Sequence, residues 1–194
     1  MAHIDYFLSV LSPWAYFAAD RLERIAERRG ATISYKPLDA LAVFAATGGL
    51  PPAQRPPARM AYRLQELRRA SAKTGMPYHE QPAHWPTDPL PASRAVIALA
   101  DAGGDAGALA RSIMSAVWVE QEDIADQSIV ETKLRAIGVD PTSLDLAAAD
   151  AAYLANTEEA VSRGVFGVPF YIVGEEMFWG QDKLDDLDRY LGQA

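Results

Sequence analysis

Two short segments carry groups whose chemistry goes beyond packing. The first, Ser12-Pro13-Trp14-Ala15, follows an apolar run and has the residue order of a helix start, because Ser is a preferred N-cap and Pro suits the first helical position. The Ser12 hydroxyl can therefore act as a helix cap, or it can donate a hydrogen bond to an anion held at the helix start. For a Ser-Pro dipeptide in isolation, the cap is the simpler interpretation.

The second segment, Gly167-Val168-Pro169, lies inside the apolar run FGVPFYIV. A proline removes one hydrogen-bond donor from a strand, so it is typical of an edge strand or a bulge. Alternatively, a cis Val168-Pro169 bond turns the N–H and C=O of Val168 outward, where they can pair with an extended, peptide-like ligand. The place of this segment in the predicted fold favours the cis interpretation.

The composition excludes several kinds of chemistry. The chain has 194 residues and no cysteine, which excludes disulfides, thiolate metal sites and Cys nucleophiles. It has 18 Lys and Arg against 26 Asp and Glu, a formal net charge of -8, so nucleic acid and anionic membranes are unsuitable partners. The His residues are separated and predict no metal site. Without a long apolar run or a basic leader segment, we expect a cytoplasmic protein.

The N-terminal quarter of the chain predicts a strand, a helix and a second strand. Residues 3–10 and 32–38 are rich in aromatic and branched side chains, which is typical of strands. The stretch from Ser12 to Gly30 predicts one amphipathic helix. This order implies a right-handed βαβ unit with parallel strands. Pro37 either ends the second strand or places it near a sheet edge.

The remaining chain predicts helices followed by a hairpin. Helices are expected over residues 93–102, 105–119, 126–137 and a stretch that ends at Gly164. Strands are expected over 166–173 and 176–179, joined by Gly174 and Glu175, before a last amphipathic helix. The order predicts an α/β, thioredoxin-like βαβ…ββα fold with an all-helical domain inserted between its halves. Residues 1–39 and 165–194 then form the thioredoxin-like domain, and residues 40–164 form the insertion.

The sequence resembles a known family in several segments. In a thioredoxin fold the first helix begins at the redox motif, and here Ser12 and Ala15 occupy both cysteine positions, which excludes disulfide exchange. The chain is similar to the kappa-class glutathione transferase and 2-hydroxychromene-2-carboxylate isomerase family, a DsbA-like branch in which serine replaces the first redox cysteine. The matching segments, in order, are DYFLSVLSPWAYFA, AYRLQELRRASAKTGMPY, AVWVEQEDIAD and GVFGVPFYIVGEEMFWGQDKL.

The resemblance implies glutathione as a cofactor, with its sulfur beside Ser12. No His lies in a family-matched position to activate Ser12, so we expect its hydroxyl to donate a hydrogen bond to the sulfur rather than to act as a base or nucleophile. A bond of roughly 1.5–3 kcal/mol would lower the thiol pKa by about one to two units. The resemblance places the rest of glutathione at Val168, Pro169, Gly180, Gln181, Asp182 and Lys183.

The resemblance also implies positions for a second substrate, an aromatic acid. These are Phe44, Gln54, Arg55 and Trp85. Arg55 would bind a carboxylate and Trp85 would stack on an aromatic ring. At the substrate site two positions depart from the family pattern, since Phe44 stands where we expect a lysine in the isomerases and Gly49 where relatives often have Asn. At the glutathione site Gln181 and Lys183 stand where the family commonly has Asn or Ser and Arg.

A function follows as an expectation. The resemblance implies a homodimeric, glutathione-dependent cis-trans isomerase of 2-hydroxychromene-2-carboxylate, or of a related aromatic-degradation intermediate, that works by reversible thiolate addition. One alternative is a kappa-like transferase or peroxidase that consumes glutathione. Another is a non-catalytic glutathione-binding protein of the same fold.

Overall fold

The chain forms one mixed sheet with helices on both faces. The computed structural model describes residues 1–193. Its strands lie in the order β2-β1-β3-β4. They are β1 (His3–Leu8), β2 (Thr32–Pro37), β3 (Phe170–Val173) and β4 (Glu176–Trp179). β1 and β2 pair in parallel, and β3 is antiparallel to both of its neighbours. The predicted α/β, thioredoxin-like order is therefore confirmed, and Pro37 both ends β2 and lies on an edge strand.

Helices fill the sequence between and around the strands. The α-helices are α1 (Pro13–Tyr16), α2 (Arg21–Arg29), α3 (Ala40–Thr47), α4 (Pro57–Thr74), α5 (Leu90–Asp101), α6 (Ala106–Ser115), α7 (Gln127–Ala136), α8 (Leu146–Ser162) and α9 (Leu184–Leu191). Shorter helical turns are η1 (Pro52–Gln54), η2 (Ala116–Glu120), η3 (Pro141–Ser143) and η4 (Gln181–Lys183). The predicted hairpin at Gly174 and Glu175 joins β3 to β4, as expected.

The single helix predicted from Ser12 to Gly30 is wrong. α1 ends at Tyr16 and α2 begins at Arg21, because Ala19 between them has a φ of 52°, in the left-handed region that cannot continue an α-helix. Gly30, with a φ of 62°, ends α2 as the sequence predicts.

Three other predicted elements differ in length. The strand expected over residues 166–173 begins only at Phe170, because the preceding Pro169 has no N–H to give to a ladder. The helix expected over 93–102 begins already at Leu90, since Pro91 fits its first turn. The helix expected over 105–119 ends as α6 at Ser115 and continues in the wider π-helical turn η2.

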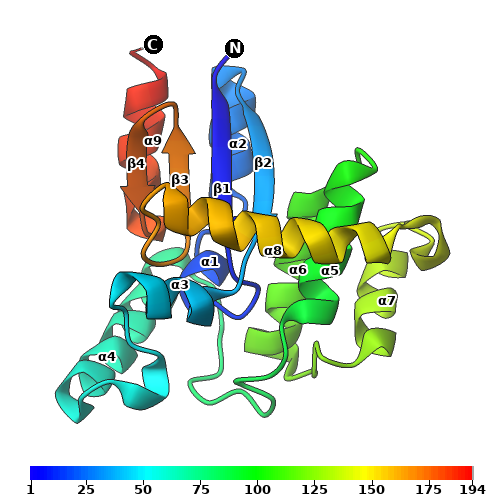
Figure 1. Ribbon diagram of the computed structural model, residues 1–194. Helices are drawn as coiled ribbons and strands as arrows, with labels where there is room; N and C mark the ends of the chain where they lie inside the picture. Colours follow the sequence, from blue (N-terminus) through cyan, green and yellow to red (C-terminus); the bar gives the residue numbers. More distant parts are fainter. Residues whose placement is uncertain (194) are drawn as a thin grey trace.

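Side chains of β1 alternate between two cores on opposite faces of the sheet. α8 crosses one face of the sheet, and α3 lies below the ends of the strands (Figure 1). Phe7 and Phe170 pack there with Val43 of α3 and Ala160 of α8.

α2 and α9 cover the other face (Figure 1), where Tyr6 and Tyr171 pack in a cluster with Leu22 and Leu187. The rings of Tyr6 and Tyr171 stack with centroids 5.0 Å apart. The sheet is therefore packed on both faces, and β1, one of its two inner strands, leads directly into the turn that holds Ser12.

The helices between β2 and β3 also contact one another. Ile97 and Ala98 of α5 pack with Ala149 and Tyr153 of α8 in a small separate core. The division of the chain at residues 40 and 164 stays a prediction. Within residues 1–193, no helix combines the length and the apolar character needed to cross a membrane.

Candidate active site

Ser12 lies in the turn that follows β1 and caps α1. Its N–H donates to Ser9 O at 2.9 Å, and its Oγ accepts a hydrogen bond from Ala15 N–H at 3.3 Å. The backbone of Ser12 is extended, with φ -80° and ψ 120°, as an N-cap requires. The cap is therefore present, and it fixes the position of the hydroxyl oxygen.

The Ser12 hydroxyl points to the second predicted segment. Its O–H donates to the carbonyl oxygen of Val168 at 3.4 Å, and both residues are buried. That distance is long for an O–H···O hydrogen bond, whose usual length is about 2.7–2.8 Å. The Val168–Pro169 peptide bond is cis, as predicted. Ser12 and Val168 thus meet, and the hydrogen bond between them is weak.

The N–H of Val168 has no acceptor within residues 1–193, neither a backbone carbonyl nor a side chain. Val168 is only 9% exposed. An unpaired amide at such a position costs free energy, and most buried amides in folded proteins are paired. The strand residues that follow Pro169 are paired with β1 and β4, so the free amide is confined to the segment next to Ser12.

The segment from Gly180 to Lys183 lies directly beside Pro169. Gly180 N–H donates to Pro169 O at 2.9 Å. Gly180 has a φ of 105°, and a Cβ there would come within 2.6 Å of Asp182 Oδ1, so this position favours glycine. The Gln181 carbonyl accepts a hydrogen bond from Arg21 at 3.1 Å. Asp182 itself is exposed.

Lys183 makes a local ion pair. Its Nζ lies 3.4 Å from Asp186 Oδ2, and half of its side chain is exposed. The residues that the resemblance assigns to glutathione therefore form one continuous path from Ser12 through Val168 and Pro169 to η4.

The predicted substrate residues are less closely grouped. Phe44 and Arg55 are neighbours, with the Arg55 guanidinium carbon 5.8 Å from the Phe44 ring centroid. A Cβ at Gly49 would come within 2.8 Å of the Phe44 ring, so the two departures from the family pattern at the substrate site are in contact with each other. Gln54 is exposed at the end of η1.

The Trp85 side chain forms a hydrogen bond to the turn that contains Ser12. Its Nε1–H donates to Leu11 O at 3.1 Å, one residue before Ser12. Its ring centroid lies 5.7 Å from that of the fully buried Trp118. The Trp85 ring also has a charged neighbour, since the Arg63 guanidinium carbon lies 5.2 Å from the Trp85 centroid.

Sequence reasoning missed Arg63. It is 8% exposed and shares the buried face of α4 with Leu67 and Ala70. The signal was its spacing of four and seven residues from these apolar positions, which places it on the core side of the helix. Burial and the charge of Arg55 lower the pKa of Arg63, and burial and Arg59 lower the pKa of Arg55.

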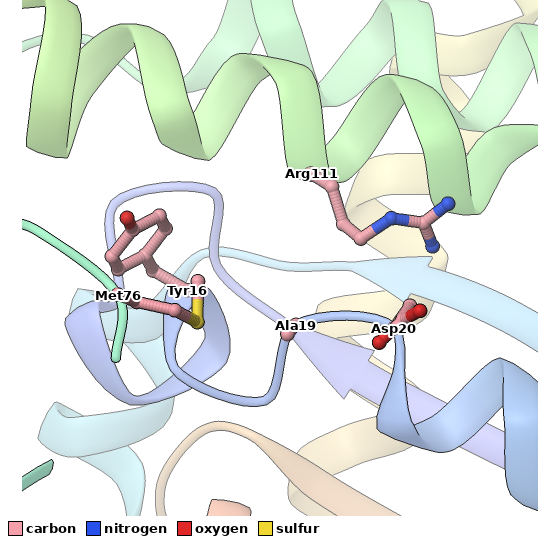
Figure 2. Close-up of a pocket in the computed structure, with 5 residues that line it drawn as sticks. All are labelled: Tyr16, Ala19, Asp20, Met76 and Arg111. Carbon is pink, nitrogen blue, oxygen red and sulfur yellow. The ribbon is translucent and has the colours of Figure 1, made fainter. Parts of the chain in front are cut away.

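A separate hollow lies near the break between α1 and α2. Figure 2 shows it, about 250 Å³ in volume, with Met76 beside Tyr16 and with Arg111 reaching down from α6. Its lining also includes Ala19, the residue with the positive φ, and Asp20. None of the residues predicted for the active site lines this hollow, so we keep it apart from the site at Ser12. Among the described residues, no cluster of His, Asp and Glu could hold a metal ion.

Known proteins share this fold over its whole length. Residues 3–192 match the family model of the DsbA-like thioredoxin domain, so the chain belongs to that class of proteins. It is 30% identical over 197 residues to a 2-hydroxychromene-2-carboxylate isomerase from Pseudomonas putida, a match that covers 98% of this chain and 94% of the relative. It is 29% identical over 194 residues to the protein of the same name from Sphingobium xenophagum, with 97% of each chain covered.

A solved structure agrees with these relatives. The structure of a 2-hydroxychromene-2-carboxylate isomerase matches with a TM-score of 0.79 at 29% identity, over 98% of this chain and 95% of that chain. This chain therefore belongs to the same family as the 2-hydroxychromene-2-carboxylate isomerases.

Proposed function

We propose that this protein is a glutathione-dependent cis-trans isomerase that acts on 2-hydroxychromene-2-carboxylate or a related intermediate of aromatic degradation. The names of its relatives support the isomerase class. The observation that carries the glutathione dependence is the pair of polar groups at one point, the weakly bonded Ser12 O–H and the unpaired Val168 N–H. A thiol-bearing peptide fits both groups.

The Val168 backbone suits the peptide part of glutathione. An extended peptide can pair with a free main-chain N–H as an added strand does. The N–H of Val168 is free within the described residues, and its C=O accepts only the long bond from Ser12. When the Ser12 hydroxyl turns to the ligand, both groups of Val168 are available to the ligand backbone.

The Ser12 hydroxyl is placed to donate a hydrogen bond to the sulfur of glutathione. Because the chain has no cysteine, it supplies no thiolate of its own. The Ser12 Oγ is held by Ala15 N–H, so the oxygen stays in place while its proton is free to leave Val168 O and point to a sulfur. A hydrogen bond to a charged acceptor contributes roughly 1.5–3 kcal/mol. Starting from a thiol pKa of about 8.5, this makes a substantial thiolate fraction at neutral pH.

The other end of glutathione fits the start of η4. The N–H groups of Gln181 and Asp182 have no acceptor within residues 1–193, and the Asp182 carboxylate is exposed. Backbone amides suit a γ-glutamyl carboxylate, and a carboxylate suits the ammonium group next to it.

The chemistry divides between the cofactor and the chain. When bound, glutathione would supply a nucleophilic sulfur for reversible addition to a conjugated carbon of the substrate, which is the chemistry that cis-trans isomerisation needs. The chain holds the sulfur in its charged form through Ser12 and orients the peptide through Val168. Trp85, fixed to the Leu11 carbonyl, presents an aromatic surface next to the same turn. These are positioning and electrostatic contributions.

The test is the turnover of 2-hydroxychromene-2-carboxylate with and without glutathione, in the wild type and in Ser12→Ala. Loss of a bond of roughly 1.5–3 kcal/mol predicts a fall in turnover of about 10-fold to about 150-fold, with glutathione binding retained. Ser9→Ala is the matched control. Ser9 is also buried and its Oγ also accepts one backbone N–H at 3.3 Å, from Leu11, so this variant should keep its turnover.

Three results would contradict parts of the proposal. Equal turnover in Ser12→Ala and the wild type would remove the role of Ser12. The absence of any thermal shift at millimolar glutathione would remove the cofactor. Stoichiometric consumption of glutathione, with a conjugate as product, would show the transferase alternative instead.

A further inference from the structure

A long loop without regular secondary structure joins α4 to α5 (Figure 1). It runs over residues 76–89, and we call it the connecting loop. Its Trp85 indole N–H donates to Leu11 O at 3.1 Å, in the turn that contains Ser12. Loops of this length inside a compact domain are usually functional. The place of the indole beside the candidate active site therefore depends on what holds this loop.

The two halves of the connecting loop are held differently. In the first half, the Tyr16 O–H donates to Pro77 O at 2.6 Å, and the His79 N–H donates to a backbone carbonyl of η2 at 2.8 Å. Residues 82–87, in the second half, form only two hydrogen bonds to other parts of the chain within residues 1–193. One is that of the Trp85 indole, and the other is that of the Thr87 hydroxyl.

The acceptor of the Thr87 hydroxyl is the carboxylate of Asp123. The Thr87 O–H donates to Asp123 Oδ1 at 2.6 Å, which is within the range of about 2.5–2.7 Å for a hydroxyl bound to an ionised acceptor. This bond, followed by that from the Ala125 N–H, lowers the pKa of Asp123. On the other side of Trp85, His84 Nδ1 lies 3.8 Å from Asp123 Oδ2. One carboxylate thus contacts the loop before and after the indole.

The turn that carries Asp123 is itself bound to α7. Glu120 and Glu122 of this turn both form ion pairs with Lys133 of α7, which is only 8% exposed. Burial by itself lowers the pKa of Lys133, but the hydrogen bonds and charges of the two carboxylates raise it by more. Separating a buried ammonium from its partners is costly, because it leaves a buried charge without compensation. The turn therefore holds Asp123 at a fixed place relative to the helices.

A second carboxylate in the same acidic segment has an ordinary role. Asp126 accepts the N–H of Ser128 at 2.8 Å and caps α7, and it forms no hydrogen bond or ion pair with the connecting loop among the described residues. Asp123 likewise accepts an N–H two residues ahead, that of Ala125, at 3.1 Å. Only Asp123 also binds Thr87. The local turn explains Asp126, but it does not explain the bond from Asp123 to the loop.

We propose that Asp123 is a positioning residue that holds Trp85 beside the Ser12 turn through Thr87. The indole then forms an aromatic surface that is in place before the aromatic substrate binds. A side chain that is already ordered loses less conformational freedom on binding, which favours affinity. The inference rests on the proposed function for the identity of the substrate. The hold on Trp85 is independent of it.

The first measurement needs no ligand. Near-UV circular dichroism reports the tertiary packing of aromatic side chains, and the ring centroids of Trp85 and Trp118 are 5.7 Å apart. The signal of Trp85 is the part of the spectrum that Trp85→Ala removes. Asp123→Ala should lose most of this signal, because the second half of the loop then keeps one hydrogen bond instead of two.

The second measurement is the turnover of 2-hydroxychromene-2-carboxylate with glutathione. Asp123→Ala should raise the KM for the chromene about 10-fold and change kcat by less than about 2-fold, since a contact made equally in the ground state and the transition state affects KM alone. The affinity for glutathione should not change. When Trp85→Ala is already present, adding Asp123→Ala should have no further effect on KM, because the two residues act as one unit.

Asp126→Ala is the matched control. It removes a carboxylate from the same acidic segment and one bond to a backbone N–H, as Asp123→Ala does, but no bond to the connecting loop. It should lower stability through the lost cap of α7 and leave both the Trp85 signal and the KM at their wild-type values. A second pair of variants leaves the acidic turn intact. Thr87→Ser keeps the donor and should behave as the wild type, whereas Thr87→Val should reproduce Asp123→Ala.

Several results would overturn the inference. They are a wild-type Trp85 signal in both Asp123→Ala and Thr87→Val, an unchanged KM in both, equal changes in Asp126→Ala, and additive effects of Asp123→Ala and Trp85→Ala on KM. A protein without isomerase turnover would contradict the proposed function. In that protein, loss of the Trp85 signal in Asp123→Ala and Thr87→Val would still support the hold on Trp85, and its retention would overturn it.

Discussion

Two groups of cations that lie over aromatic rings differ in whether carboxylates of the chain neutralise them. In the first, Lys36 and Arg163 each lie 5.7 Å from the ring centroid of Phe7. Both contact Asp5 and Glu159, and we call these four charged residues the paired cluster. In the second, Arg55 lies over Phe44 and Arg63 lies over Trp85, and within residues 1–193 neither forms an ion pair with a carboxylate. We call these two residues the arginine corner.

The difference separates cations whose carboxylate partners belong to the chain from cations that have no such partner among the described residues. The paired cluster links β1, β2 and α8, elements far apart in the sequence, and its partners are already in the chain. The arginine corner links no elements by ion pairs. The three predictions below test this contrast.

The largest expected effect is on folding. Arg163→Met breaks two ion pairs with partly buried partners and should lower the free energy of unfolding by about 1–3 kcal/mol. Arg63→Met replaces a cation that has no carboxylate partner among the described residues. This variant should change the free energy of unfolding by less than about 0.5 kcal/mol, or increase it. Urea denaturation of both variants at neutral pH measures the two values. Similar losses in both would mean that Arg63 is structural and that the contrast does not hold.

A smaller effect on the free energy of unfolding is expected when the pH is lowered. Burial by itself raises the pKa of Asp5, but the hydrogen bond from Arg163 and the charges of Lys36 and Arg163 lower it by more. Burial also raises the pKa of Glu159, but the hydrogen bonds from Lys36 and Arg163 and the charges of both residues lower it by more. A carboxyl with a lowered pKa stabilises the fold above its unfolded pKa, about 4, and this contribution disappears as the pH falls through the folded pKa.

The unfolding free energy should therefore decrease as the pH falls below about 5, and the decrease should be shallower in Asp5→Asn. Arginine does not titrate in this range, so Arg63→Met should show the same slope as the wild type. Urea midpoints at a series of acidic pH values measure the slopes. An Asp5→Asn slope equal to that of the wild type would show that this pair contributes nothing to acid sensitivity.

The smallest effect is expected from salt. Raising the ionic strength from about 0.01 M to about 1 M shortens the Debye length from about 30 Å to about 3 Å, which screens Arg55 and Arg59 but not a direct contact. Binding of glutathione, the anionic ligand of the proposed function, should weaken only several-fold, while the stability difference between Arg163→Met and the wild type changes less. Titrations at the two ionic strengths measure this. Salt-independent binding would mean that apolar contacts hold the ligand.

Local patterns predicted most of the fold and the first half of the site. The strands, the hairpin at Gly174 and the cap at Ser12 depend on residue types within a few positions of one another, which sequence shows directly. The break at Ala19 was not predictable in this way. Alanine is the best helix former, and its left-handed conformation here is imposed by the surrounding structure.

Arg63 was missed for a related reason. It stands in AYRLQELRRA, among arginines that are exposed on the same helix, and the apolar positions that share its face are few. A helix pattern can say that an arginine faces inward. It cannot say whether a carboxylate from another element lies there, as Asp5 of β1 does for Arg163.

The sequence by itself determined that this chain has a thioredoxin-like order of elements, no thiol of its own and a serine at the start of the first helix, because composition and local propensity are properties of neighbouring residues. Only the tertiary structure decided which groups meet. It brought Ser12 to Val168, 156 residues away, and it gave Arg163 two carboxylates and Arg63 none. Hydrogen bonds and ion pairs depend on distances across the fold, and those distances are set by packing rather than by any local pattern.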